Sequence, residues 1–268
     1  RRAGFHRAAG WMAPGAAAGQ VVLFAQWLAW VFHVDDQWDE AGDTDGGAAV
    51  RAAHERFLGI VRGTVAARAG EPAEVALADL WARTAPRASR HWQERFAFHL
   101  GLQRDAFARQ AELRRRGLVP GPGEYRVLRR HANCPAAFHL LEPLYREEMP
   151  LGLVADWVAL TDAVNDVTAW CNDLASVERE AACGDPTNYV TVLRHHLGLS
   201  ADEAARQVRL AVTHRMADIA RGRRALLDRS TSPSVGLLAG LLADVPGRHL
   251  AWVRESGRYR AGVDRTAG

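Results

Sequence analysis

Three oxygen-bearing side chains recur at every fourth position in one stretch of the sequence, namely Asn172, Ser176 and Glu180. On a helix, residues with this spacing lie on the same face. An amide, a hydroxyl and a carboxylate offer only oxygen ligands, which suit a hard cation such as Mg²⁺ rather than zinc or copper. The pattern therefore predicts a divalent-cation site on a helix face.

A second acidic cluster, Asp35-Asp36-Gln37-Trp38-Asp39-Glu40, follows the apolar stretch Val21–Phe32. On a helix Asp35 and Asp39 share a face, and Asp36 lies about 100° round from Asp35. Carboxylates this close repel one another at the end of a buried helix, and bound cations relieve that repulsion. Taken alone, such a cluster is also typical of a solvent-exposed helix end, so its interpretation depends on the other motif.

Together the two motifs resemble the metal-binding signature of bacterial class I terpene synthases, the terpene cyclases. That family carries an aspartate-rich D-D-x-x-D motif, often followed by E, and a second motif N-D-L-x-S-x-x-x-E. Asp35–Glu40 matches the first motif, and Asn172–Glu180 satisfies every fixed position of the second. The longer motif is much the more specific, and the two in this order make the resemblance strong.

The resemblance extends over nearly the whole chain. Tyr125–Arg130 matches a Y-x-x-x-R-R pattern, Asn188–Leu197 resembles an N-x-V-x-V-L-R segment, and Trp252–Tyr259 resembles a closing W…R-Y element. The family fold is one all-α bundle around a deep apolar cavity, with the metal motifs facing each other across its mouth. We therefore expect a single α-helical domain over residues 1–268. Trimming of its N-terminus stays open, because the chain does not begin with methionine.

The resemblance also implies a set of metal ligands, because the family uses three Mg²⁺ ions. By matching positions, Asp35 would hold two of the ions, and Asn172, Ser176 and Glu180 would hold the third. Asp36 and Asp39 are optional further ligands. In relatives the second aspartate often bonds the arginine of the closing R-Y pair, which here would join Asp36 to Arg258.

Basic side chains should complete a diphosphate site, since arginine offers a planar fork of donors to phosphate oxygens. Arg179, directly before Glu180, matches a Lys/Arg position of the family. Arg258 and Tyr259 match its closing R-Y pair. The resemblance therefore implies that these three residues contact the diphosphate of the substrate.

The upstream arginine that senses diphosphate in the family has two candidates here. The Y-x-x-x-R-R context favours Arg129, whereas the usual distance to the second metal motif favours Arg126. Counted from Arg129, the residues that trigger ionisation would be Ala132 and Asn133. This pair departs from the commoner Asp/Thr-then-Gly pattern of relatives, which leaves the trigger open.

Once diphosphate has left, a carbocation must be kept from water, and aromatic faces stabilise its charge. Phe32 lies one helical turn before the aspartate cluster and is expected below the metal site, with Phe24 and Leu28 on the same face. Phe138 and Trp170 are further candidates for the cavity wall. The alternative for each aromatic residue is a place in the packing core, which is the commoner fate at helical spacing.

Helical periodicity dominates the 268-residue chain, and strand signals are scarce. Short loops between the helices predict one all-α domain. A capping box is expected at Ser200 and Glu203. We expect helices over Val21–Asp39, Ala48–Arg62, Ala73–Thr84, Ser89–Arg115, Tyr125–Tyr145 with a kink near Pro135, Leu153–Glu180, Ser200 to about Leu227, and a last stretch before Gly247.

The composition is ordinary for a soluble globular protein, with 48% hydrophobic and 24% charged residues. Acidic and basic residues alternate along the expected helices at a net charge of +3, so we predict no nucleic-acid partner. The three cysteines lack metal spacing, and their odd number argues against a disulfide framework, which favours the cytoplasm. The stretch Val21–Phe32 is too short to span a membrane, and no secretory signal is evident.

The resemblance to terpene cyclases implies a Mg²⁺-dependent enzyme that ionises a linear isoprenyl diphosphate, cyclises the carbocation to a sesquiterpene or diterpene and releases diphosphate. Farnesyl diphosphate is the first candidate substrate and geranylgeranyl diphosphate the second. A chain-elongating prenyltransferase of the same fold is an alternative, although it would carry a second D-D-x-x-D motif. A catalytically silent helical isoprenoid-binding protein is another. The resemblance also makes a homodimer an expectation.

Overall fold

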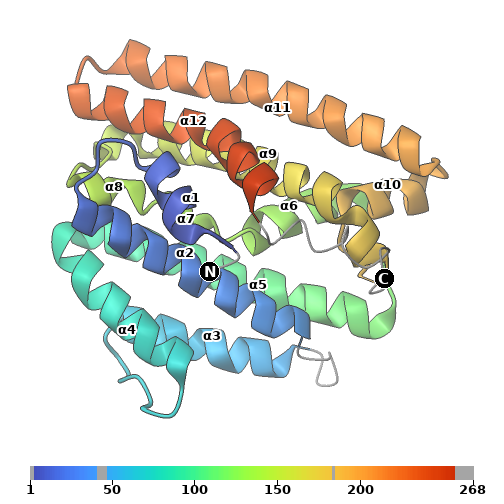
Figure 1. Cartoon of the computed structure of the whole chain (residues 1–268), viewed down its shortest axis with the longest axis horizontal. Coiled ribbons are helices and arrows are strands. Elements are labelled where there is room, and N and C mark those ends of the chain that lie inside the picture. Colours follow the sequence, from blue (N-terminus) through green and yellow to red (C-terminus); the bar gives the residue numbers. More distant parts are fainter. Residues whose placement is uncertain (1–2, 41–46, 183–184, 257–268) are drawn as a thin grey trace.

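The apolar stretches of the sequence form amphipathic helices whose buried faces meet in the middle of a bundle (Figure 1). The computed structural model describes residues 3–40, 47–182 and 185–256, with only the backbone of 39 and 40. Within these residues the regular elements are all helical, which confirms the predicted all-α class. The α-helices are α1 (Phe5–Met12), α2 (Ala18–Glu40), α3 (Ala48–Val61), α4 (Pro72–Thr84), α5 (Arg90–Arg116), α6 (Pro122–Ala132), α7 (Pro135–Phe138), α8 (Leu141–Tyr145), α9 (Val154–Ala182), α10 (Tyr189–Leu197), α11 (Ala201–Arg229) and α12 (Pro233–Glu255).

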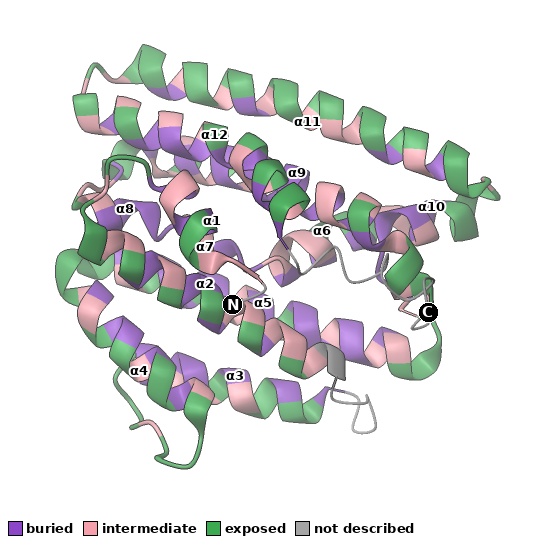
Figure 2. Cartoon of the chain, viewed as in Figure 1, coloured by how far each residue is buried: buried purple, intermediate pink, exposed green. Residues whose placement is uncertain are grey.

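The helices pack with their buried faces inward and their exposed faces towards solvent (Figure 2). α11 runs along α9 at one edge of the bundle, and α3 packs against α5 and α4 at the opposite edge (Figure 1). The short helix α1 lies against both α2 and α12. The elements that carry the two acidic motifs, α2 and α9, therefore lie inside the bundle, with other helices supporting them from behind.

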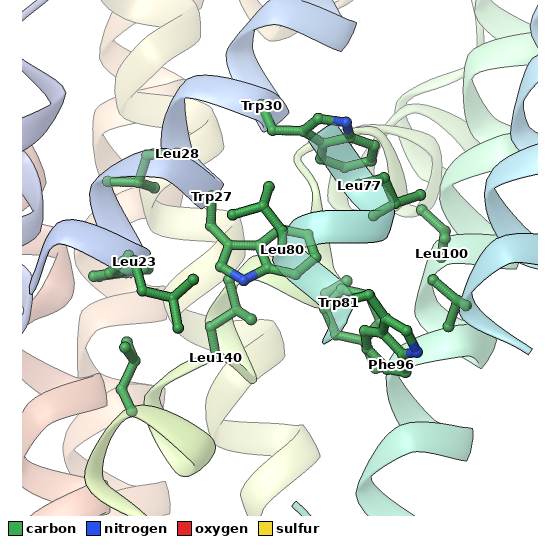
Figure 3. Packing of buried hydrophobic residues seen from close by; sticks show 14 of the residues in the cluster. Leu23, Trp27, Leu28, Trp30, Leu77, Leu80, Trp81, Phe96, Leu100 and Leu140 are labelled. Carbon is green, nitrogen blue, oxygen red and sulfur yellow. The ribbon is translucent and has the colours of Figure 1, made fainter. Parts of the chain in front are cut away.

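Tryptophan residues anchor the part of the core behind α2. Trp27 is 1% exposed, and its Nε1 donates to Thr84 Oγ1 at 2.9 Å; Trp92 is fully buried and donates to the carbonyl of His139 at 3.0 Å. Figure 3 shows Trp27 among leucines, with Leu23 and Leu28 of α2, Leu80 of α4 and Leu140 near it. A buried aromatic side chain removes about 150–250 Å² from water, so this cluster fixes one side of α2 and leaves its other side for the site.

The ends of α5 and α11 follow the signals in the sequence. Ser200 Oγ accepts from the Glu203 backbone N–H at 3.3 Å, and the Glu203 carboxylate accepts from the Ser200 N–H at 2.9 Å. This confirms the predicted capping box. α5 ends at Gly117, whose φ of 60° is in the left-handed region that glycine tolerates.

The expected helix Tyr125–Tyr145 is wrong as a single element. The chain there forms three short helices, α6, α7 and α8. Cys134 takes a left-handed φ of 51°, and the next residue, Pro135, has no N–H to continue the backbone ladder. The resulting break is much sharper than the predicted kink.

The last helix also differs from the prediction, which ended it before Gly247. α12 continues through Pro246 and Gly247 to Glu255. Buried side chains on both sides of the break signal, Val245 and Trp252, keep this segment packed on the bundle. Tertiary packing thus outweighs the low helix propensity of proline and glycine.

Two further expectations concern the chain's surroundings. In the described segments no helix is long and apolar enough to cross a membrane. Cys134 and Cys171 are free thiols rather than disulfide partners.

Candidate active site

A cavity of about 170 Å³ opens into the bundle between α2, α5, α6, α7, α9 and α12. One water molecule needs only about 10–15 Å³ on the same measure, so the space is large enough for an organic ligand. Polar and charged side chains line one part of the cavity, and apolar and aromatic side chains line the rest. The two acidic motifs contribute to the polar part.

The two metal motifs meet at this cavity. Asp35 of α2 lines it, as do Asn172 and Glu180 of α9, two turns apart on the same helix face. Glu180 is held by Asn188, whose Nδ2 donates to Glu180 Oε2 at 2.8 Å. Three of the four predicted ligands, one from the first motif and two from the second, therefore share one space, and Ser176 does not line it.

Ser176 lies between Asn172 and Glu180 and is 3% exposed. Its Oγ donates to the backbone carbonyl of Asn172 at 2.8 Å. Because that bond uses the hydroxyl hydrogen, the oxygen lone pairs are the part of Ser176 that can act as a ligand.

The donor set fits a hard divalent cation whose remaining coordination positions a phosphate-bearing ligand would fill. Among the described residues, no three His, Cys, Asp or Glu side chains lie close enough to hold a metal ion by themselves. Mg²⁺ is commonly bound by one or two carboxylates together with substrate phosphates and water. Asp35 and Glu180 supply such carboxylates, and Asn172 adds an amide oxygen.

The remaining residues of the aspartate motif and its expected partners are placed less fully. Asp36 is half-buried and does not line the cavity. The side chain of Asp39 lies outside the described part of the structure, as do Arg258 and Tyr259. Their expected roles stay predictions.

Arg129 lines the cavity and joins α6 to the second metal motif. Its Nε donates to Asp173 Oδ1 at 2.8 Å, and its Nη2 donates to Asn172 Oδ1 at 3.1 Å. Tyr125 donates its hydroxyl to the other oxygen of the same carboxylate. Burial lowers the pKa of Arg129, but the combined interactions with Asp173, Tyr125 and Glu180 outweigh that effect, and the pKa is well above the ordinary value. Arg129 is thus a permanent cation in the cavity wall.

The competing candidate, Arg126, is exposed and does not line the cavity. Arg130, next to Arg129, also faces away, because its Nε and Nη2 donate to Asp166 at 2.8 and 2.7 Å. Arg179 does line the cavity, with a largely exposed side chain 3.5 Å from Glu180. Of the predicted diphosphate arginines that the structure describes, Arg129 and Arg179 are therefore the two beside the metal motifs.

Arg114 is a cavity-lining cation that the sequence analysis missed. It lies in the last turn of α5, is 17% exposed and approaches Asp185 at 3.8 Å. Phe107 and Gln110 precede it on the same face of α5 and also line the cavity. This spacing of three and four residues was visible in the sequence, but nothing there indicated which face of the helix meets the cavity.

The apolar part of the cavity includes four of the five expected wall residues. They are Phe24, Leu28, Phe32 and Phe138. The ring of Phe32 lies 5.4 Å from that of Trp252 and 5.1 Å from that of Phe5. This aromatic group forms a wall with the electron-rich faces that attract positive charge.

Trp170 is a correction to the expected cavity wall. It is 4% exposed and packs against Tyr189, with ring centroids 5.4 Å apart, on the side of α9 that faces α10. Two helical positions separate it from both Thr168 and Asn172, which line the cavity. Residues two apart lie about 200° round a helix, so Trp170 has to point the other way.

Ala132 and Asn133, the expected trigger positions, both line the cavity at the break after α6. The amide nitrogen of Asn133 donates to Asn165 Oδ1 at 2.6 Å and to Thr168 Oγ1 at 3.2 Å. These bonds tie the end of α6 to α9. The structure brings the pair to the site without assigning it a role.

Comparisons with known proteins match this arrangement. A family model described as terpene synthase family 2, C-terminal metal binding, matches residues 26–218. The chain belongs to this terpene synthase family. The matched region contains both acidic motifs and Arg129, and its description agrees with the metal site expected from them.

Curated relatives and solved structures agree with the family. The (+)-T-muurolol synthase ((2E,6E)-farnesyl diphosphate cyclizing) of Roseiflexus castenholzii is 34% identical over 194 residues, covering 71% of this chain and 60% of that protein. The (+)-eremophilene synthase of Sorangium cellulosum is 25% identical over 95% of this chain and 78% of its own. The crystal structure of germacradien-4-ol synthase from Streptomyces citricolor superposes with a TM-score of 0.78 and 25% identity, over 94% of this chain and 83% of that one.

The family assignment confirms the predicted class I terpene synthase fold. The chain spans about 60% of the length of the muurolol synthase that it matches. The number of Mg²⁺ ions, the single-domain boundary, the cytoplasmic location and the homodimer stay predictions.

Proposed function

We propose that the protein is a Mg²⁺-dependent terpene cyclase that ionises farnesyl diphosphate, cyclises the resulting cation to a sesquiterpene and releases diphosphate. One observation carries the proposal. A single cavity combines oxygen ligands from two helices, Asp35 on α2 and Asn172 and Glu180 on α9, with arginines beside them and an aromatic wall beyond. A packing core has no need for that combination, because buried charges destabilise unless they are paired.

The chemistry of the substrate explains why acidic and basic side chains line the same cavity. A diphosphate is anionic and would be repelled by Asp35 and Glu180 alone. When bound there, Mg²⁺ would neutralise part of that charge and make diphosphate a better leaving group. Arg129 and Arg179 would bind phosphate oxygens directly, and Arg114, which lines the same cavity, would be available to join them.

The remaining wall suits the second half of the reaction. Phe24, Leu28 and Phe138 are apolar, so they would keep water from the cation, and the rings of Phe32 and Trp252 would stabilise its charge. A folded prenyl chain would contact these residues while its diphosphate stays among the arginines.

Farnesyl diphosphate is the favoured substrate because the name of a related protein includes it. The muurolol synthase of Roseiflexus castenholzii is described as farnesyl diphosphate cyclizing. Geranylgeranyl diphosphate is the second candidate. Purified protein should be incubated with geranyl, farnesyl and geranylgeranyl diphosphates and Mg²⁺, followed by gas chromatography–mass spectrometry and a diphosphate-release assay. A cyclic sesquiterpene that disappears with excess EDTA is expected, and full turnover in EDTA would contradict the metal assignment.

Variants of the second motif test the ligand roles. Glu180→Gln keeps the shape and an acceptor for Asn188 but removes the charge, and Asn172→Ala removes the amide oxygen. Each should lower kcat/KM at least about 10²-fold, or roughly 3 kcal/mol of transition-state stabilisation. Glu178→Ala is the matched control, because Glu178 is exposed on the same helix and does not line the cavity. Equal activity in all three variants would show that the second motif is an ordinary polar helix face without a role in binding metal.

A further inference from the structure

His249 is a cavity residue to which neither the sequence motifs nor the proposed ionisation step assigns a role. It lies on α12 between Val245 and Trp252, and all three line the cavity. Their spacing of four and three residues puts them on one helix face. Its ring centroid is 5.7 Å from that of Trp252, which in turn contacts Phe32. His249 is therefore part of the wall expected to face the carbocation.

The nitrogen Nδ1 of His249 is buried and has no hydrogen-bond partner among the described residues. Buried polar atoms are nearly always satisfied, so such an atom in a cavity wall indicates a ligand or a chemical role. Burial, together with the nearby charge of Arg129, lowers the pKa of His249 to about 4. The imidazole is therefore neutral at pH 7 and keeps a lone pair.

The other polar side chains of the cavity are poorer proton acceptors in this position. Asn172, Gln110 and Asn133 are amides, which are hardly basic. Asp35 and Glu180 belong to the expected metal site, and Asp185 accepts hydrogen bonds from Thr187 and lies 3.8 Å from Arg114. Among the described lining residues, His249 is the neutral base on the aromatic wall.

We propose that His249 is the general base that takes the final proton from the carbocation on its imidazole, so that the reaction ends in an olefin. The inference rests on the proposed cyclase function. In this step a C–H bond next to the cationic carbon breaks, and its electron pair forms the new C=C bond. The proton binds the lone pair of the neutral imidazole to give an imidazolium, so the positive charge moves from carbon to His249 and nothing is oxidised.

The electrostatics of the wall suit this transfer and its reversal. The step moves a positive charge from carbon to the imidazole and creates no new charge. The charge of Arg129 therefore opposes this transfer less than it opposes protonation of His249 by water. A carbocation is a far stronger acid than an imidazolium, even one with a lowered pKa. That same lowered pKa makes the imidazolium release its proton to water or diphosphate when product leaves.

His249→Phe and His249→Gln test the proposal with farnesyl diphosphate and Mg²⁺. Phenylalanine keeps the aromatic packing without a base, and glutamine keeps a polar group that cannot carry the proton. Diphosphate release should fall by less than about tenfold in both, because the arginines and metal motifs are intact. The share of the main wild-type olefin should fall at least about tenfold, replaced by olefins with other double-bond positions and by alcohols.

A stereospecifically deuterated substrate adds a readout that packing alone would not set. In the wild type one particular hydrogen of a geminal pair should be lost, because a base fixed in the cavity wall reaches the cation from one face. In the variants either hydrogen of the pair should be lost. His195→Phe, an exposed histidine outside the cavity, should leave products and selectivity unchanged. Unchanged products in both His249 variants, or an alcohol as the only wild-type product, would overturn the role of His249. A wild-type protein that releases no diphosphate from any isoprenyl substrate would instead overturn the cyclase function beneath it.

Discussion

Replacing Arg129 should damage stability and turnover for two separate reasons. Arg129→Met leaves the Asp173 carboxylate, 1% exposed, with Tyr125 as its remaining close side-chain donor. Breaking a buried ion pair by removing one partner costs about 3–5 kcal/mol. At roughly 2–4 °C per kcal/mol for a chain of about this size, the melting temperature should fall by roughly 6–20 °C.

The effect on turnover follows from the cavity position of the guanidinium. Losing one charge-assisted contact to phosphate removes about 1.5–3 kcal/mol, or roughly 10- to 200-fold in kcat/KM. Diphosphate release from farnesyl diphosphate measures this loss, and calorimetry with inorganic diphosphate and Mg²⁺ measures binding. Arg126→Met is the matched control. Because Arg126 is exposed and outside the cavity, it should cost less than about threefold and leave the melting temperature unchanged.

A double variant separates the two effects. Arg129→Met with Asp173→Asn removes the uncompensated buried charge, so much of the lost stability should return while turnover stays low. Recovery of turnover together with stability would show that Arg129 matters only for folding. A larger loss of turnover in Arg126→Met than in Arg129→Met would make Arg126 the diphosphate sensor.

Three further predictions concern the cavity wall and the buried charges. Phe32→Ala should leave diphosphate release within about tenfold of wild type but enrich early-quenched or acyclic products in gas chromatography–mass spectrometry; an unchanged profile would make Phe32 a packing residue. Glu142→Gln should lower the free energy of unfolding in urea by about 3–5 kcal/mol, because Glu142 is fully buried and neutralises buried Arg95; a loss below about 1 kcal/mol would contradict this pairing. The hydrogen bond from Arg56, together with those from Arg68, lowers the pKa of Glu74 from 4.5 to about 2. The contribution of Glu74 to stability is therefore present above pH 4.5 and is lost as the pH falls towards 2. Thermal unfolding followed by circular dichroism should therefore show a smaller fall in melting temperature for Glu74→Gln than for the wild type over that pH interval. Melting temperatures that fall in parallel would show that Glu74 is not the group responsible.

The helix-face arithmetic explains which site residues the sequence could predict. Asn172 and Glu180 share a face because they are eight positions apart, and both line the cavity. The same arithmetic should have excluded Trp170, which lies two positions from Asn172 and therefore on the far side of α9. The prediction for Trp170 was wrong because it treated an aromatic side chain near a motif as part of the site.

Other features needed tertiary information. The periodicity of α5 puts Phe107, Gln110 and Arg114 on one face, but the sequence does not say that this face meets α9 across a cavity. His249 follows a proline and a glycine inside α12, where local propensity predicts that a helix ends. Only packing of the bundle keeps the helix intact there and turns the imidazole inward.

The neighbours Asn172 and Asp173 show how one helix can set two parts of the site at once. Adjacent residues lie about 100° apart, so Asn172 faces the cavity while Asp173 faces α6. Arg129 donates to both, at 3.1 and 2.8 Å. Arg129 is therefore fixed by the residue next to a candidate metal ligand. A shift of α6 against α9 would disturb the positions of Arg129 and Asn172 together. This explains why a sequence match to the second motif is informative about the arginine as well, although the two lie on different helices.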